Sequence, residues 1–372
     1  MKSGWKETTL GEVVEFQRGF DLPIQNRTTG KYPLVVSNGI DGFVDEYKVK
    51  GPGVITGRSG TLGKVFFIEG NFWPLNTTLW IKDFKCNDEK FIYYWLLNFP
   101  FEKFNAGSGV PTLNRNHIHP TPVTVPESIT EQKAIAAVLS SFDDKIELLR
   151  RQNKTLESIA HTIFKQSFVK DESWDGNLSE YLKVQGGYAF KGEDFKEVGF
   201  AGIIKITNIT MGVIDISNSQ FVDENIVTDI DEDKFRIHGG DFLIAMTGAE
   251  IGKIGIVEET KRQIWLNQRV GKLISKVPYG DLAGYLALRS REGQEHIINA
   301  AAGSAQANIS SSGIEEMAFA PYSEKVTNSF GEKVKPLFEK ITFNLFQIQT
   351  LSKLRNLLLP KLMRGKMRVK ID

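Results

Sequence analysis

Polar side chains that can read DNA bases gather in the glycine-rich loops of this chain. Arginine can form two hydrogen bonds with guanine, and asparagine or glutamine can do the same with adenine. Glycine lets the backbone of such loops approach a phosphate closely. We therefore expect a nucleic-acid interface whose candidate residues are Arg18, Arg58, Ser59, Thr61, Asn76, Thr77, Ser108, Asn114, Arg115, Lys205, Asn208, Thr247, Asn267, Gln268, Arg269, Ser304, Gln306 and Asn308.

Four segments imitate catalytic or metal sites, but each lacks a necessary part. Residues 98–101 approach a motif of amino-methyltransferases without its first proline, and residues 104–109 imitate a cofactor loop without a preceding buried strand. Residues 57–64 resemble a phosphate-binding loop, but a strand is expected after them instead of a helix. His117 and His119 have no third ligand, which favours two surface histidines. We expect no catalytic set and no metal or cofactor on this chain.

The candidate loops recur because the chain consists of two similar halves. The recurring markers, in chain order, are Trp5 and Trp174, Gly63-Lys64 and Gly252-Lys253, residues 73–76 and 265–267, and Gly107-Ser108 and Gly303-Ser304. A period of roughly 190 residues is far longer than that of solenoid repeats, so each copy must be a complete domain with its own helix. Two such modules predict a pseudo-two-fold molecule that holds two related sites.

Short β-rich segments separated by turn residues fill each half and indicate an α+β fold with curved mixed β-sheets. Strands are expected over 32–36, 53–56, 64–68, 203–206, 241–244 and 253–257, and helices over 88–97 and 281–298. We expect two similar α/β domains, separated by two long antiparallel helices that form a coiled coil. The expected boundaries are 1–126 for the first domain, 127–169 for a central helix, 170–322 for the second domain, and 323–372 for a C-terminal helix and basic tail.

Both long helices carry a heptad seam with one polar interruption. Apolar residues step by four and three from Ile135 to Ile163 around Asn153, and a matching seam from Val334 to Leu358 contains Asn344. A polar residue inside such a seam commonly fixes register, so we expect antiparallel packing with Asn153 opposite Asn344. The first seam would then span roughly 42 Å, or about 12 base pairs of DNA.

Composition is that of an ordinary soluble globular protein. The formal net charge is +1, but basic residues dominate from Lys333 to Lys370, whereas an acidic segment lies between Asp223 and Asp233. The single cysteine, Cys86, excludes an intramolecular disulfide and is expected to be a minor buried residue. No apolar run suggests a secretory signal or a membrane span, so we expect a cytoplasmic protein.

Several motifs together resemble the DNA-specificity subunits of type I restriction-modification systems. The resemblance covers essentially the whole chain, and its motifs are loose individually but distinctive jointly. They are Trp-x4-Leu-Gly with Gln-x-Gly-aromatic at the start, the Gly-Lys turns, Asn267-Gln268-Arg269, the run from Glu131 to Ile135, and the ending from Leu359 to Gly365.

This resemblance implies a non-catalytic subunit with two target recognition domains, each reading one half of a split sequence in double-stranded DNA. It implies that methyltransferase subunits, two in number, dock on the helices, and that restriction and translocase subunits join them. S-adenosylmethionine, ATP and Mg would be bound by those partners. The sequence sets Arg58-Ser59-Gly60-Thr61 against Thr247-Gly248-Ala249-Glu250, and Arg115 against Ser311, so the two half-sites should differ.

Two other interpretations remain open from the sequence. One is the equivalent specificity subunit of a type IIB or IIG-like restriction-modification enzyme, in which nuclease and methyltransferase are fused. The other, from a different class, is a coiled-coil adaptor whose paired domains bind protein. An adaptor predicts no salt-sensitive binding to duplex DNA, whereas phosphate contacts demand a steep dependence on salt.

Overall fold

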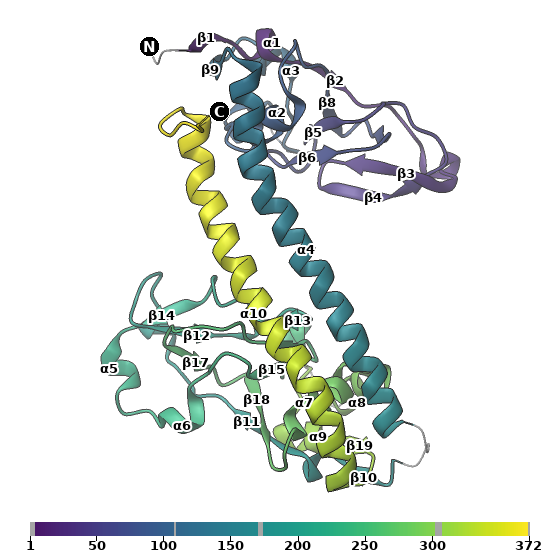
Figure 1. Ribbon diagram of the computed structural model, residues 1–372, viewed down its shortest axis with the longest axis vertical. Coiled ribbons are helices and arrows are strands. Elements are labelled where there is room, and N and C mark those ends of the chain that lie inside the picture. The colour runs from purple at the N-terminus through teal and green to yellow at the C-terminus, as the bar shows by residue number, and fades with distance from the viewer. Residues whose placement is uncertain (1–3, 108, 170–173, 302–306, 371–372) are drawn as a thin grey trace. The chain divides into compact units, whose positions relative to one another are not determined.

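The computed structural model describes residues 4–107, 109–169, 174–301 and 307–370. Its contacts divide the chain into two compact units, Met1–Lys145 with Leu351–Asp372, and Ile146–Thr350. Each unit is β-rich and takes one stretch from each of two long helices, α4 (Ile129–Phe168) and α10 (Glu324–Met363) (Figure 1). The expected mixed α+β fold, with two β-rich domains and two long helices, is therefore confirmed.

The first unit holds two main sheets. One has the strand order β2-β8-β5-β6, with antiparallel neighbours, and the other has the order β4-β3-β7, in which β3 and β7 run parallel; β1 pairs with β9. The elements are β1 (Trp5–Thr9), α1 (Leu10–Val13), β2 (Glu15–Arg18), β3 (Thr29–Val36), β4 (Gly39–Val44), β5 (Gly53–Gly57), β6 (Val65–Ile68), β7 (Trp73–Pro74), β8 (Thr78–Asp83), α2 (Glu89–Leu96), α3 (Arg115–Ile118) and β9 (Pro122–Pro126).

The second unit repeats this strand order. Its sheets are β11-β18-β15-β16-β13 and β14-β12-β17, with β12 parallel to β17, and β10 pairs with β19. The elements are β10 (Gly176–Asn177), β11 (Leu182–Gly186), β12 (Ala201–Ile204), β13 (Gly212–Val213), β14 (Gln220–Val222), α5 (Glu224–Val227), α6 (Glu232–Phe235), β15 (Phe242–Ala245), β16 (Ile254–Ile256), β17 (Ile264–Leu266), β18 (Val270–Ser275), α7 (Gly280–Arg289), α8 (Arg291–Ala301), α9 (Ser311–Glu315) and β19 (Ala318–Phe319). Apart from the added β13, each strand of one unit has a counterpart in the other.

Two local expectations from the sequence were wrong. The helix expected over 281–298 is broken into α7 and α8 at Ser290, whose backbone is extended and whose hydroxyl accepts a hydrogen bond from the N–H of Gly293 (3.1 Å). Serine at such a position ends one helix and caps the next. Cys86 is exposed rather than buried, because it lies in a turn after β8 with a positive φ of 64°.

The start of α4 is fixed to the first unit by two polar side chains. Trp5 donates from its indole N–H to the Glu131 carboxylate (3.1 Å). The buried Gln132 donates to the carbonyl of Pro126 (3.0 Å), and its own carbonyl accepts the N–H of Asp88, the residue that caps α2 (2.9 Å). The Glu-Gln pair of the sequence motif therefore joins α4 to the strand before it and to α2.

Both long helices contribute to the core of the first unit. Ile135 and Leu139 of α4 and Leu362 of α10 are buried with Phe91 and Leu96 of α2. Burial of a large apolar side chain contributes about 1.5 to 3 kcal/mol. The helix stretches are therefore part of the domain core and not external struts.

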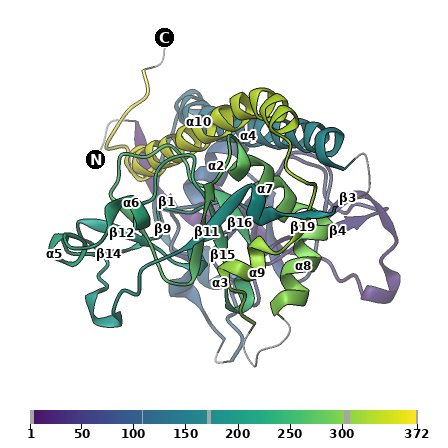
Figure 2. The ribbon, with the colours of Figure 1, turned by 90° about the horizontal axis from the view of Figure 1, so that it is seen from below.

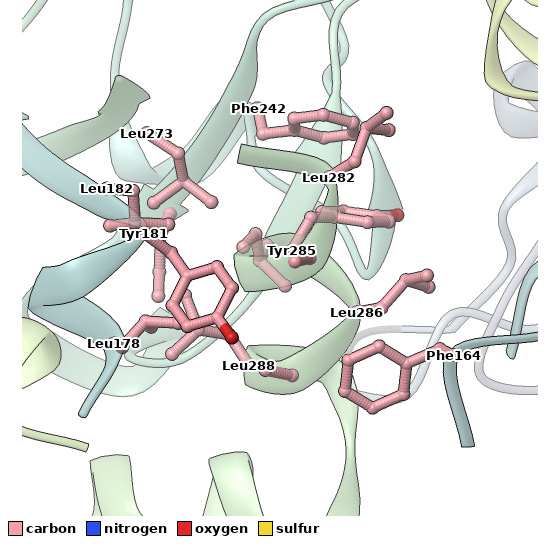
Figure 3. Packing of buried hydrophobic residues seen from close by; sticks show 14 of the residues in the cluster. Phe164, Leu178, Tyr181, Leu182, Phe242, Leu273, Leu282, Tyr285, Leu286 and Leu288 are labelled. Carbon is pink, nitrogen blue, oxygen red and sulfur yellow. The ribbon is translucent and has the colours of Figure 1, made fainter. Parts of the chain in front are cut away.

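The core of the second unit is built in the same way. The ring of Tyr285 in α7 stacks on Phe242 of β15 (centroids 4.3 Å apart) and meets the edge of Phe338 of α10 (5.4 Å). Figure 3 shows Tyr285 with Phe242 and Leu282 on one side and Leu286 on the other. Figure 2 shows α7 between the strands β15 and β16 and the long helices of this unit. A helix of the domain is thus enclosed between sheet and long helices.

Within the second unit, α4 and α10 meet at an amide pair. The side-chain N–H of Asn344 donates to the side-chain oxygen of Asn153 (2.7 Å) and to that of Gln152 (2.9 Å), and Asn344 is fully buried. The carbonyl oxygen of Asn344 has no partner among the described residues. This polar layer lies between apolar positions of both seams, including Leu149 and Ile341.

We expect Asn344→Ala to lower the free energy of unfolding by about 1 to 3 kcal/mol, because it removes both hydrogen bonds from a buried site. The double variant Asn153→Leu/Asn344→Leu should be as stable as the wild type or more so, because no unpaired amide then remains. Urea unfolding of the three proteins measures the difference. A double variant less stable than Asn344→Ala would contradict this account of the layer.

Candidate nucleic-acid interface

Three loops of the first domain are held together by backbone hydrogen bonds. The N–H groups of Arg58 and Ser59, which follow β5, both donate to the carbonyl of Thr77, between β7 and β8 (2.8 and 3.1 Å). The carbonyl of Arg58 accepts the N–H of Leu113, in the segment before α3 (2.7 Å). Residues more than 50 positions apart in the sequence are therefore neighbours at one edge of this domain.

A hollow of about 770 Å³ lies beside these loops. Four of the predicted residues line it, namely Arg18, Arg58, Asn114 and Arg115. The lining residues that were not among the candidates include Glu15, Gln17, Asp21 and Lys82. Glu15 and Gln17 alternate along β2, and Lys82 lies on the paired strand β8, so the strand pattern could have pointed to these three, since alternate residues share one face of a strand. Asp21 follows β2 and has no such signal.

Two of the four cations in this hollow are neutralised locally. Arg18 pairs with Asp21 (3.6 Å), and Lys82 pairs with Glu15 (3.3 Å). Arg58 and Arg115 instead donate to backbone carbonyls and form no ion pair with any described carboxylate. The hollow therefore presents both positive groups and carboxylate acceptors.

The second domain holds its loops by the same bonds. The N–H of Met246 donates to the carbonyl of Arg269 (3.1 Å), and the carbonyl of Met246 accepts the N–H of Ile309 (2.9 Å). Isolated bridges join Thr247 to Asn308 here and Ser59 to Thr112 in the first domain. The two domains thus share one loop scaffold.

This scaffold corrects the loop alignment taken from the sequence. Arg58 and Met246 make the same two backbone bonds, so Arg58 corresponds to Met246, and Ser59 corresponds to Thr247. The alignment from the sequence instead pairs Arg58 with Thr247. The loop after β15 is one residue longer than the loop after β5. The N–H of Gly57 donates to the carbonyl of Lys64, whereas the N–H of Ala245 donates to the carbonyl of Lys253. A residue inserted in a loop leaves no periodic signal, which explains the shift.

The same comparison pairs the next loop. The N–H of Thr78 donates to the carbonyl of Leu75, and that of Val270 donates to the carbonyl of Asn267 (both 2.9 Å). Leu75 therefore corresponds to Asn267, and two further pairs follow along the loop, Asn76 with Gln268 and Thr77 with Arg269. The expected pairing of Arg115 with Ser311 agrees with the bonds of Leu113 and Ile309.

The other candidates differ in how accessible they are. Gln268, Arg269 and Asn308 are exposed, whereas Thr61, Asn76, Thr77, Thr247 and Asn267 are half-buried. Ser108, Ser304 and Gln306 lie outside the described residues.

Lys205 and Asn208 share a turn after β12. Asn208 is only 5% exposed, and its amide accepts the N–H of Lys205 (2.9 Å) and donates to the carbonyl of Asp215 (3.2 Å). The Lys205 ammonium lies 3.3 Å from the centroid of the Phe195 ring, and burial lowers the pKa of Lys205. Asn208 therefore shapes the turn, while Lys205 lies half-buried at its edge.

His119 is not the surface histidine that the sequence suggested, whereas His117 is exposed. The His119 Nε2 accepts the N–H of Phe16 in β2 (3.1 Å), and its ring stacks on that of Phe16. Burial, together with Arg115, lowers the pKa of His119. The imidazole thus joins β2, which lines the hollow, to the end of α3.

The described residues contain no group of three or more His, Cys, Asp or Glu side chains that could hold a metal ion. None of the helices in the described part of the chain has the length and apolar character that crossing a membrane requires.

Comparison with known proteins identifies a family and relatives that match most of the chain. Residues 2–158 and 171–320 match the family described as the type I restriction modification DNA specificity domain. The chain is 24% identical over 306 residues to the specificity subunit of the type I restriction enzyme MjaVIII of Methanocaldococcus jannaschii, covering 73% of this chain and 71% of that protein. It is 28% identical over 286 residues to the MjaIX specificity subunit of the same organism, covering 71% and 65%.

A solved structure shows the same fold. The S subunit of a type I restriction-modification system from M. genitalium matches with a TM-score of 0.64 and 18% identity, over 99% of this chain and 97% of that one.

We expect the stability of this chain to fall in mild acid partly because of His119. The pKa of His119 is lowered in the folded state. Its contribution to the free energy of unfolding is therefore complete above the unfolded pKa of about 6.5 and is lost as the pH falls through the folded pKa. His119→Gln keeps an acceptor but does not titrate. The free energy of unfolding of the wild type, minus that of His119→Gln, should therefore decrease from about pH 7.5 to about pH 5. A difference that does not change with pH would contradict this role.

Proposed function

Since this chain belongs to the family of type I restriction modification DNA specificity domains, we propose that each of its two domains reads one half of a bipartite target in double-stranded DNA. The chain is the specificity subunit of a type I restriction-modification system, and this subunit is not catalytic. In this family the cofactors reside on the methyltransferase and restriction subunits.

The observation that carries the proposal is one loop scaffold, built twice, with different side chains on it. Ser59 and Thr247 occupy equivalent bridges, as do Thr112 and Asn308, but Arg58 is replaced by Met246. Phosphate contacts position a protein on DNA, whereas side chains at base edges determine the sequence that is read. Equal scaffolds with unequal side chains suit two different half-sites.

The remaining predicted residues fit this proposal to different degrees. We propose that the exposed or half-buried loop residues contact DNA directly, with Asn208 acting only through the shape of its turn. Binding of duplex DNA by the assembled complex should then weaken steeply with salt, because lysine and arginine contacts release counterions from the duplex. A protein-binding adaptor would show no such dependence.

The long helices offer a surface for the methyltransferase subunits. Phe343 and Phe346 of α10 are 47% and 43% exposed in the second unit, and Leu354 and Leu357 are 44% and 62% exposed in the first. Large apolar side chains exposed on neighbouring helix turns are typical of interaction surfaces. Two methyltransferase subunits, one for each unit, would dock there, and the restriction and translocase subunits would join the resulting complex.

The amides of Asn153 and Asn344 would fix the register of the two helices, and the helix length would set the gap between half-sites. The proposed division of the chain is the one expected from the sequence: 1–126 and 170–322 for the recognition domains, and 127–169 and 323–372 for the helices and basic tail. The strand pairing β1-β9 and β10-β19, which joins the ends of each β-rich segment, supports these limits.

Exchange of residues 1–126 for the equivalent domain of a relative should change one half of the methylated target and leave the other half intact. The reason is that the loops of each domain are held by bonds within that domain. Sequencing of methylated adenines in a host that expresses the hybrid with its partner subunits measures the result. If both halves change together, the domains do not read independently.

Insertion of one heptad into each helix should lengthen the gap by about 3 base pairs, since seven residues add about 10.5 Å to a helix. Insertions between Lys145 and Ile146 and between Thr350 and Leu351 fall at the limits of the two units and keep the seams in phase. The same half-sites should be methylated at the new spacing. An unchanged gap in an active complex would show that the helices do not set it.

A further inference from the structure

The hollow of the first domain contains two arginines that are not neutralised by carboxylates. Arg18 and Lys82 each have an acidic partner, but Arg58 and Arg115 have none among the described residues. Both of them line the same hollow. Two guanidiniums that keep their charge beside a concave surface are available to a ligand with hydrogen-bond acceptors.

The backbone of Arg58 is held on both sides. Its N–H donates to the carbonyl of Thr77 and its carbonyl accepts the N–H of Leu113, so the Cα cannot shift without breaking both bonds. One guanidinium nitrogen, Nη1, lies 3.5 Å from the carbonyl of Asn76, and the remaining N–H groups have no bond to a described residue. An edge with two parallel donors is therefore left open, as recognition of a planar ligand requires.

The side chain of Arg115 is held by a hydrogen bond to strand β2. Its Nη1 donates to the carbonyl of Phe16 in β2 (3.1 Å), and its other N–H groups also have no bond to a described residue. Because Phe16 also binds His119, the segment after Asn114 is tied to β2 at two points. Both arginines are thus attached to a rigid frame by one nitrogen only.

The acidic residues of the hollow are hydrogen-bond acceptors, which a base amino group can use and a phosphate, having no donor, cannot. Asp21 and Glu15 line the same surface, and each carboxylate keeps lone pairs beside its pairing with Arg18 or Lys82. Carboxylates do accept the amino group of cytosine, while arginine donates to O6 and N7 of guanine. Unpaired arginines beside carboxylates therefore complement the major-groove edge of a G·C base pair.

The second domain lacks this combination. Arg58 is replaced there by Met246, which is 8% exposed, and Arg115 is replaced by Ser311. The exposed Arg269 stands instead where the first domain has Thr77. The two arginines are therefore specific to the first domain.

We propose that Arg58 and Arg115 are specificity-determining residues that each read a guanine in the half-site bound by the first domain. This assignment rests on the proposed function, because it requires that the first domain reads one half of a bipartite target. It adds the base and the side chain, which the family does not supply.

Arg58→Gln and Arg115→Gln test the assignment, because glutamine has the length to reach a base but prefers adenine. Each variant is expressed with its partner subunits in a host without other adenine methylation, and the methylated motif is determined by sequencing. Each should lose discrimination at one guanine of one half-site by on the order of 10- to 100-fold, with a gain for adenine at that position. The second half-site should remain unchanged, which shows that the complex is folded and assembled.

Arg27→Gln is the matched control, since it removes an arginine of the same domain that lies outside the hollow and pairs with Asp41 (3.3 Å). Its motif should equal that of the wild type. The same relaxation in Arg27→Gln would reveal a general loss of charge and would overturn the assignment.

If a variant complex shows no methylation, its binding to purified DNA duplexes is measured instead. Fluorescence anisotropy compares the wild-type target with targets in which each guanine is replaced in turn, over a range of salt concentrations. Loss of preference for one guanine supports base reading. Equal weakening on all duplexes, with the salt slope reduced by about one, would mean a phosphate contact and would overturn the assignment.

The outcome for the wild type separates this inference from the proposed function. A wild-type complex that methylates no bipartite target would overturn the proposed function, and the assignment with it. A bipartite target that Arg58→Gln and Arg115→Gln both leave unchanged would overturn the assignment alone.

Discussion

Each β-rich domain completes its hydrophobic core with residues of both long helices. This shared core determines how the domain packs on the helix stretches of its own unit. In the first unit, Leu139 and Leu362 are buried with Phe91 of α2. In the second unit, Phe164 and Phe338 are buried with Tyr285 of α7. A domain that must cover one of its own helices with two others cannot rotate freely about them, because rotation would expose that apolar surface to water.

A tyrosine hydroxyl and an ion pair add direction to this packing in each unit. The hydroxyl of Tyr94 donates to Asp143 of α4 (2.6 Å), which also pairs with Arg355 of α10. In the second unit, Arg289 donates to the hydroxyl of Tyr285 (2.6 Å) and pairs with Glu157 of α4 (3.0 Å). Burial raises the pKa of both tyrosines, so the hydroxyls remain protonated near neutral pH. Apolar contact alone is non-directional, and these bonds fix how each domain helix lies on the long helices.

The loops can vary because the frame that holds them uses backbone atoms. The bonds that join the β5 loop to Thr77 and Leu113 involve only N–H and C=O groups, and the second domain repeats them with Met246, Arg269 and Ile309. Any residue except proline can supply such bonds. A family that must read many DNA sequences can therefore exchange side chains in these loops without losing the arrangement of the loops.

The sequence by itself determined the duplication, the mixed α+β class, the two heptad helices and the loops that carry polar side chains. These features are local or periodic: spacing along one segment reveals a seam, and alternation reveals a strand. Only the tertiary structure decided that Arg58 corresponds to Met246, that the amide of Asn208 is used within its turn, and that His119 accepts the N–H of Phe16. These contacts depend on which distant segments meet, and on where a loop gains one residue. Neither is encoded in the residue types of a single segment.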